Sequence, residues 1–249
     1  MGLTSYGIIT GAGAIRSSML LNDSCEKIRE DETVSRTIDI TGTIANGMWN
    51  YGMPFPDIAI KPVATLAEHG FDGHAFQLHS FAGTYLETAN HLFAGREQLH
   101  HIDPSRFFMR AWVAQVPDKA PLEPIYAHEL EEAVGDVLEP GDALLIATGW
   151  DSRWNTAEFT TASPFFSDET MEWIVQRSVS LLGVDITSIE DPRKPPDVMS
   201  QLAHYFAGDR LLLAPVVRLR EAGKGPWTLT VLPLAVHGVC AAPCRAILR

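Results

Sequence analysis

The sequence has 249 residues, of which 46% are hydrophobic and 20% charged, a composition typical of a globular domain and not of a disordered or fibrous chain. Aspartate and glutamate outnumber lysine and arginine by 31 to 19, so the formal charge is −12. Such an acidic surface repels phosphate backbones and argues against nucleic acid as a partner. No apolar stretch has the length of a transmembrane helix or the character of a signal-peptide core, and the three cysteines are an odd number. We therefore expect a cytoplasmic protein with no membrane partner.

The regular pattern of the chain begins after residue 34. Residues 37–40 (TIDI) alternate as a short strand does, and residues 111–116 form an apolar segment that ends at a proline. We expect residues 1–34 to be an N-terminal extension and residues 35–249 to be a single domain.

Predicted helices and strands alternate through the rest of the chain. Residues 127–137 are expected to form a helix, and a Pro-Gly-Asp turn leads into the apolar run 143–147, which is typical of a buried strand. Ser167 is a favourable helix N-cap, and the helix that follows leads into the apolar run 181–186. Further strand candidates are residues 211–217 and 228–236. This alternation predicts an α/β domain.

The densest cluster of reactive side chains lies at residues 79–91, with the sequence HSFAGTYLETANH. If residues 85–87 are extended, Tyr85 and Glu87 point to the same side of the strand. Together with the imidazole of His91, this phenol and carboxylate supply acid, base and hydrogen-bonding groups for a carbonyl substrate. A buried polar network with all its hydrogen bonds satisfied is the alternative that composition leaves open.

Residues 81–91 resemble the motif H-x-G-T-H-x-D-x-P-x-H of the cyclase family, which includes bacterial kynurenine formamidase and isatin hydrolase. The segment FAGTYLETANH lies on this motif without gaps. Later segments that resemble the family, in the same order along the chain, are residues 138–150, 164–174, 183–190 and 232–246. The resemblance implies the swivelling β/β/α fold of this family and assembly as a homodimer or homotetramer.

The resemblance also implies a metal site, and this sequence departs from it. In metal-dependent members the first two histidines and the aspartate of the motif bind zinc or manganese, and those positions are Phe81, Tyr85 and Glu87 here. Phenylalanine cannot bind a metal, and a neutral tyrosine is a poor ligand for zinc. The later histidine ligand is best matched by His204, and the stretch 214–217 has no carboxylate where the family has a glutamate. We therefore expect no metal cofactor.

The polar residues that remain in the motif favour a remodelled site. The resemblance implies that His91 acts as the acid/base, and its ordinary pKa suits proton transfer near neutral pH. We expect Glu87 and Tyr85 to be catalytic with it, by positioning the substrate or stabilising developing charge. The expected substrate-binding residues are His79, His204, Trp49 and Phe81. Large rings in the predicted loops suit a small-molecule substrate with an aromatic or hydrophobic group.

The favoured function is therefore a metal-independent enzyme that hydrolyses, cyclises or dehydrates a small carbonyl compound. One alternative is a metal-dependent amide or lactone hydrolase, with zinc or manganese held by relocated ligands drawn from His79, Glu87, His91 and His204. A second alternative is a non-catalytic family member that binds a ligand or partner through the old pocket. Cys240 and Cys244 lack a second ligand pair, so we expect them to be buried or strand-end thiols and not a zinc site.

Overall fold

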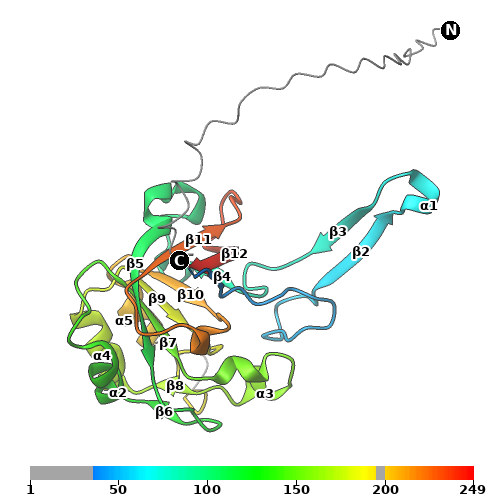
Figure 1. Ribbon diagram of the computed structural model, residues 1–249. Coiled ribbons are helices and arrows are strands. Elements are labelled where there is room, and N and C mark those ends of the chain that lie inside the picture. The colour runs from blue at the N-terminus through cyan, green and yellow to red at the C-terminus, as the bar shows by residue number, and fades with distance from the viewer. Residues whose placement is uncertain (1–35, 195–199) are drawn as a thin grey trace, which may run out of the picture. The chain divides into compact units, whose positions relative to one another are not determined.

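A sheet that closes on itself is the centre of the computed structural model, which describes residues 36–194 and 200–249 (Figure 1). The strands of this closed barrel are β4 (Tyr85–Glu87), β5 (Phe108–Gln115), β7 (Ala143–Ala147), β9 (Leu181–Val184), β10 (Leu211–Ala214), β11 (Trp227–Pro233) and β12 (Ala241–Leu248). Their order is β12-β11-β5-β7-β9-β10-β4, and β4 pairs with β12 to complete the circle. Strands β5, β7, β9 and β10 are parallel, while their other neighbours run antiparallel. The predicted α/β class is confirmed. The predicted extension, residues 1–34, lies outside the described residues.

Both faces of the central strands are buried, which explains their unbroken apolar runs. Leu145 and Leu213 belong to the cluster that fills the barrel, whereas Leu144 and Leu212 belong to the cluster on its outer face. Successive residues of a strand point to opposite faces, so each run supplies both clusters. The interior is so full that a Cβ on Gly183 would lie 2.2 Å from Cδ2 of Leu145.

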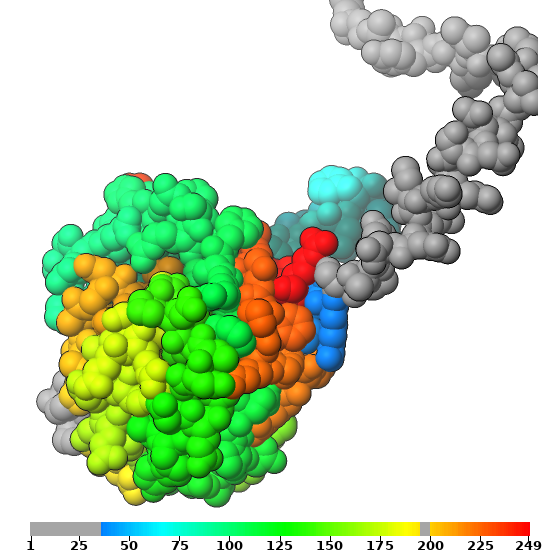
Figure 2. All heavy atoms as spheres, turned by 60° about the vertical axis from the view of Figure 1, so that its left-hand side comes forward, coloured from blue at the N-terminus to red at the C-terminus, as the bar shows by residue number. Residues whose placement is uncertain are grey.

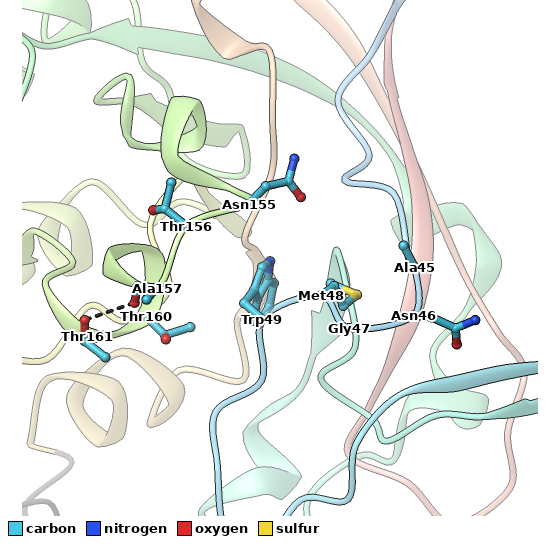
Figure 3. Close-up of a pocket in the computed structure, with 10 residues that line it drawn as sticks. All are labelled: Ala45, Asn46, Gly47, Met48, Trp49, Asn155, Thr156, Ala157, Thr160 and Thr161. Atoms are coloured by element: carbon cyan, nitrogen blue, oxygen red, sulfur yellow. Dashed lines mark hydrogen bonds between the residues drawn. The ribbon is translucent and has the colours of Figure 1, made fainter.

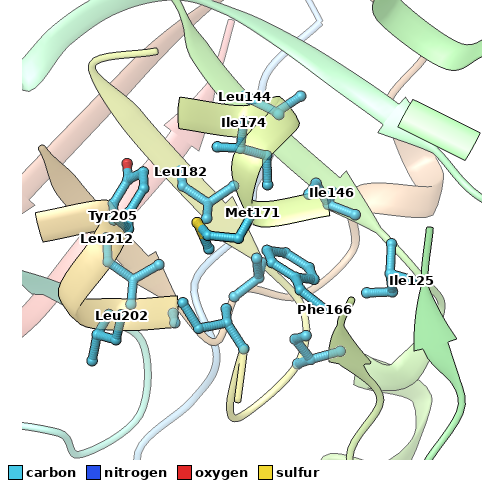
Figure 4. Packing of buried hydrophobic residues seen from close by; sticks show 14 of the residues in the cluster. Ile125, Leu144, Ile146, Phe166, Met171, Ile174, Leu182, Leu202, Tyr205 and Leu212 are labelled. Carbon is cyan, nitrogen blue, oxygen red and sulfur yellow. The ribbon is translucent and has the colours of Figure 1, made fainter. Parts of the chain in front are cut away.

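Helices α2 (Ala127–Val134), α4 (Asp168–Gln176) and α5 (Ser200–Phe206) contribute buried residues to the outer cluster. Figure 4 shows Met171 and Ile174 of α4 and Leu202 and Tyr205 of α5. As the sequence predicts, Ser167 caps α4, and its Oγ accepts a hydrogen bond from the Thr170 N–H at 3.2 Å. Helix α2 ends at Val134, before the predicted residue 137. The green segment α2 and the yellow segment α4 lie side by side on one face of the molecule (Figure 2). None of the described helices is long and apolar enough to cross a membrane.

A hairpin that the sequence pattern does not predict is formed by β2 (Ala59–Ala64) and β3 (Gly73–Gln77), which are joined through α1 (Leu66–His69). The hairpin projects from the barrel (Figure 1), and the Phe71 and Phe76 side chains on it are 59% and 67% exposed. Pro62 and a shift of register next to it interrupt the alternation that would have marked β2 as a strand. The remaining short elements are β1 (Ile38–Asp39), which pairs with β12, the pair β6 (Pro124–Ile125) and β8 (Phe165–Phe166), and α3 (Glu158–Thr161).

Replacing Leu213 by alanine is expected to lower the free energy of unfolding by about 2–5 kcal/mol, because a packed barrel interior cannot refill the space. Leu213 is fully buried in β10, whereas Leu232 on β11 is 50% exposed. The matched control Leu232→Ala removes the same atoms from a wet site, and we expect a loss below about 1 kcal/mol. Urea unfolding measures both changes, and equal losses would contradict a filled interior.

Candidate functional site

Strand β4 places two polar side chains on the outer face of the barrel. It is hydrogen-bonded on both sides, with Glu87 opposite Leu212 of β10 and Ala241 of β12. Leu86 belongs to the cluster inside the barrel, so its neighbours Tyr85 and Glu87 point outward, as the expected extended conformation requires. The short strand therefore holds both side chains in a fixed direction.

A carboxyl group and an imidazole meet directly beyond this strand. Thr88 caps the short 3-10 turn Ala89–His91, which carries the ring of His91 back toward Glu87. Nδ1 of His91 lies 3.3 Å from Oε1 of Glu87 and 3.7 Å from Sγ of Cys240. Glu87 is only 3% exposed, so water does little to solvate its carboxyl group.

Burial pushes both members of this pair toward their uncharged forms. It raises the pKa of Glu87 from its ordinary 4.5 to about 8, and it lowers the pKa of His91. At neutral pH a protonated carboxyl group therefore faces a neutral imidazole. In the tautomer that carries its proton on Nδ1, the side facing Glu87, Nε2 of His91 carries the free lone pair of a base.

Two tyrosine hydroxyls meet on the other side of Glu87 along β4. The hydroxyl oxygens of Tyr51 and Tyr85 are 3.1 Å apart, and the Tyr51 hydroxyl donates to the carbonyl of Thr187 at 3.1 Å. Because Tyr51 has only one proton to donate, Tyr85 is the donor between the two hydroxyls. Burial raises the pKa of both phenols, so both remain donors at neutral pH.

These groups line a cavity of about 280 Å³. The rings of Tyr51, Phe55, Phe81 and Tyr85 form its aromatic wall, with centroids 5.4 Å apart for Phe55 and Phe81. The remaining lining residues are Glu87, His91, Thr187, Ser188, Ile189, Glu190, Leu202 and Leu212. A cavity at the small end of the usual range suits a compact ligand with one or two rings.

The structure brings together most of the residues that the sequence predicts for the site. Tyr85, Glu87, His91 and Phe81 all line the cavity. His79 lies behind this wall: its ring packs on that of Phe55 at 4.9 Å, and its Nδ1 accepts a hydrogen bond from the Phe81 N–H at 3.3 Å. His79 therefore supports the wall without lining the cavity.

The structure does not bring His204 to the cavity. Its side chain is 48% exposed, and Nε2 lies 3.0 Å from Oε2 of Glu172 on α4. Leu202 of the same helix lines the cavity. Two residues along an α-helix differ by about 200° around its axis, so a helix that turns Leu202 inward turns His204 away.

Trp49 also lies outside the cavity. It lines a separate cavity between residues 45–49 and 155–161 (Figure 3), and its ring packs against Trp154 at 5.2 Å. The ring of Tyr51 lies 5.3 Å from that of Trp49. Trp49 is therefore not among the residues that line the cavity, and it packs against the lining residue Tyr51.

Glu190 lines the cavity and is not among the site residues that the sequence predicts. Its Oε1 accepts a hydrogen bond from the Leu202 N–H at 2.8 Å, and its Oε2 is buried without a hydrogen-bond partner among the described residues. Its only sequence signal is its place at the end of the segment 183–190, which resembles the family. Tyr51 and Phe55 had a weak signal, as two of many rings in a predicted loop.

The side chains present do not fit the metal centre that the family resemblance implies. In residues 36–194 and 200–249, no three His, Cys, Asp or Glu side chains gather closely enough to hold a metal ion. The apolar ring of Phe81 stands at one ligand position, and the Tyr85 hydroxyl at another is bonded to Tyr51. We derive no catalytic step through a metal.

The family model described as "Putative cyclase" matches residues 38–191, which include the whole motif. The chain belongs to the cyclase family. It is 32% identical over 97 residues to kynurenine formamidase of Bordetella pertussis, covering 39% of this chain and 43% of that protein. It is 28% identical over 173 residues to kynurenine formamidase of Bordetella petrii, covering 70% and 78%. The chain thus matches less than half the length of the first relative.

Solved structures of the family share the fold of this member. Isatin hydrolase A from Ralstonia solanacearum superposes with a TM-score of 0.73 at 19% identity, covering 86% of this chain and 91% of that chain. A "predicted metal-dependent hydrolase" from Bacillus stearothermophilus gives a TM-score of 0.69 at 15% identity, covering 86% and 97%. At these identities the likeness concerns the fold alone, and it confirms the fold that the resemblance implied.

The buried carboxyl of Glu87 is expected to make the protein less stable as pH rises. Glutamate in the unfolded chain titrates near its ordinary 4.5 and Glu87 in the folded chain near 8, so between these values the folded state binds the additional proton. Linkage then lowers the free energy of unfolding by up to about 1.4 kcal/mol per pH unit from about pH 5 to 8.

Glu87→Gln tests this effect because it keeps the shape of the side chain and removes the titration. The free energy of unfolding of the wild type minus that of Glu87→Gln is expected to fall steadily between pH 5 and 8. Urea unfolding at four pH values measures it, and a difference that stays constant or rises would show that Glu87 is ionised in the folded protein.

Proposed function

We propose that this cyclase-family protein hydrolyses a small amide or lactone that carries an aromatic group, and that it does so without a resident metal. The observation that carries the proposal is the Glu87–His91 pair, which lies 3.3 Å apart at the edge of an aromatic cavity. The relatives named kynurenine formamidase and isatin hydrolase support amide hydrolysis as the reaction class.

The pair and Tyr85 supply the groups that hydrolysis needs. With Glu87 ionised, its carboxylate accepts the Nδ1–H of His91, and Nε2 takes a proton from water as the water oxygen attacks the carbonyl carbon. The Tyr85 hydroxyl breaks its hydrogen bond to the Tyr51 hydroxyl and donates a hydrogen bond to the oxyanion that forms on the substrate. The C–N or C–O bond then breaks, and the proton on Nε2 passes to the leaving nitrogen or oxygen. The products are a carboxylic acid and an amine or alcohol, which balances the water consumed.

His91→Ala is expected to lower kcat/KM by about 10²–10⁴-fold, because it removes the general base. The assay uses a panel of aryl formamides, cyclic aromatic amides and aromatic lactones in excess chelator. The matched control is His204→Ala, which makes the same replacement on the exposed side of α5 and should change kcat/KM by less than about twofold. Turnover that is lost in chelator and restored by zinc or manganese would contradict a metal-independent reaction.

The pH profile of the same assay reports the state of Glu87. The reactive form needs the ionised carboxylate, so kcat/KM of the wild type should rise with pH and level off above about 8, the pKa of Glu87. Glu87→Gln, whose amide does not titrate, should lose this rise. A wild-type profile that is flat from pH 6 to 9 would contradict the assigned proton transfer.

We also propose that the chain forms a homodimer or homotetramer through the β2–β3 hairpin. The large apolar side chains of Val63, Leu66, Phe71 and Phe76 are exposed there. A lone two-stranded hairpin is marginally stable in water, and apolar side chains gathered on a projecting element are typical of an interaction surface. A second copy that covers this surface supplies the missing packing.

The double variant Phe71→Ser/Phe76→Ser is expected to sediment as a monomer of 27.4 kDa, while the wild type sediments as a larger species. Phe108→Ser is the control, since Phe108 on β5 is 54% exposed but lies outside the hairpin. Sedimentation velocity distinguishes the species. A monomeric wild type, or a double variant that still assembles, would contradict this interface.

A further inference from the structure

Three imidazole rings that take no part in the proposed reaction gather away from the cavity. The ring centroid of His100 lies 3.9 Å from that of His101 and 4.6 Å from that of His237. His100 and His101 belong to the 3-10 turn Leu99–His101, whereas His237 lies on the loop that joins β11 to β12. This histidine cluster therefore connects two segments that are far apart in the sequence.

The ring of His100 holds the β11–β12 loop through an unprotonated nitrogen. Its Nδ1 accepts a hydrogen bond from the Gly238 N–H at 3.3 Å. Beside this bond, the Leu99 N–H donates to the Val239 carbonyl at 3.1 Å. An imidazolium carries a proton on both ring nitrogens and has no free lone pair, so protonated His100 cannot accept the Gly238 N–H. The bond therefore holds the loop only while Nδ1 of His100 is free of a proton.

No carboxylate neutralises a proton that the histidine cluster takes up. In the described part of the chain, the histidines that pair with a carboxylate are His69, His74, His91 and His204. The acidic side chains nearest the cluster in the sequence are engaged elsewhere. Glu97 pairs with Arg106 at 2.9 Å. Asp103 accepts a hydrogen bond from the Ser105 N–H at 2.8 Å. A second proton on the cluster thus places like charges side by side without compensation.

The same loop reaches the candidate site at Cys240. The Cys240 carbonyl accepts a hydrogen bond from the Thr88 N–H at 2.9 Å, and its Sγ lies 3.7 Å from Nδ1 of His91. Thr88 caps the turn that carries His91. A loop that is released at Gly238 therefore loosens the segment that packs beside the imidazole of the site.

We propose that His100, His101 and His237 form an acid-sensitive latch, which releases residues 234–240 from the turn Leu99–His101 when the cluster takes up protons. Desolvation, and then the charges of His101 and His237, lower the pKa of His100 below its ordinary 6.5, a value that the released loop restores. The closed form thus binds fewer protons than the open form, so the loop is closed above about pH 6.5 and opens as pH falls below it.

The sign of this effect separates it from the titration of Glu87. Protonation of Glu87 favours the folded chain at low pH, whereas protonation of the histidine cluster opens one loop of it. A local loss of protection at residues 234–240 in a chain that stays folded is therefore the signature of the latch. The latch also does not depend on the proposed hydrolysis, because no substrate enters the argument.

Two matched variants isolate His100. His100→Asn places an amide oxygen close to the position of Nδ1, so it keeps an acceptor for the Gly238 N–H and removes the titration. His128→Asn is the control, because it makes the same replacement at an exposed histidine of α2 whose ring packs on Tyr126, outside the cluster.

Hydrogen exchange read by mass spectrometry at about pH 7.5 and pH 5.5 measures the opening, with labelling times scaled to the intrinsic exchange rates. One additional proton on the open form raises the opening constant by up to about tenfold per pH unit. We expect the protection of residues 234–240 to fall at least about threefold at the lower pH in the wild type and in His128→Asn. In His100→Asn it should change by less than about 1.5-fold. Residues 143–147 of the buried strand β7 serve as the internal reference and should stay protected.

Equal protection of residues 234–240 at both pH values in the wild type overturns the inference, and so does a fall of the same size in His100→Asn. A fall that residues 143–147 share reports global unfolding and also contradicts the latch. If His100→Asn melts early by circular dichroism, the wild-type comparison of residues 234–240 with residues 143–147 still decides.

Discussion

The double pairing of β4 is the constraint on which both the barrel and the candidate site depend. Three residues, Tyr85–Glu87, hydrogen-bond to β10 on one side and β12 on the other, and this closes the sheet. Leu86 packs inside the barrel, and because successive residues of a strand point to opposite faces, Tyr85 and Glu87 face outward. Thr84 secures the entry to the strand: its hydroxyl donates to the Pro215 carbonyl at 2.6 Å and accepts the Gly42 N–H at 2.8 Å. The same pairings of β4 therefore close the barrel and orient the side chains of Tyr85 and Glu87.

Burial beside β4 determines the protonation states of Glu87, His91 and Cys240. A carboxylate that is 3% exposed and has no lysine or arginine partner among residues 36–194 and 200–249 is costly, which is why the proton stays on Glu87 to a higher pH than usual. His91 responds in the opposite sense and stays neutral. The Sγ of Cys240 lies near Nδ1 of His91 and is a weak polar neighbour. Burial is the main cause that raises the pKa of the Cys240 thiol, and the negative charge of ionised Glu87 raises it further. A raised thiol pKa makes Cys240 a poor nucleophile, so the imidazole is the base that this arrangement provides.

The sequence predicts the parts of this structure that depend on local patterns. The buried strand 143–147, the Ser167 cap and the extended 85–87 segment all follow from periodicity or capping chemistry, and the structure has each of them. The features that the sequence does not predict depend on tertiary geometry. His204 was matched by type and order along the chain, but the phase of α5 turns it to solvent and turns Leu202 inward. The Tyr51–Tyr85 contact joins residues 34 positions apart, and the orphan oxygen of Glu190 is visible only once the cavity has walls. No local signal encodes either feature.

Phe81 stands at a position where the resemblance implies a metal ligand, and the same residue forms part of the cavity wall. Phe81 occupies a position where metal-dependent relatives are expected to hold a ligand, and here its ring packs edge-on against Tyr85 at 5.0 Å and against His91 at 5.3 Å. The apolar Phe81 ring lies against the His91 imidazole and lines the same cavity as Glu87, and burial is the first cause of the pKa shifts of both Glu87 and His91. A metal polarises a carbonyl through its charge; a site without that charge needs a base strong enough to act near neutral pH and donors aimed at the oxyanion. Phe81 therefore stands where the resemblance implies a ligand and also packs against the imidazole that we propose as the base, so Phe81, Glu87 and His91 belong together in the proposed mechanism.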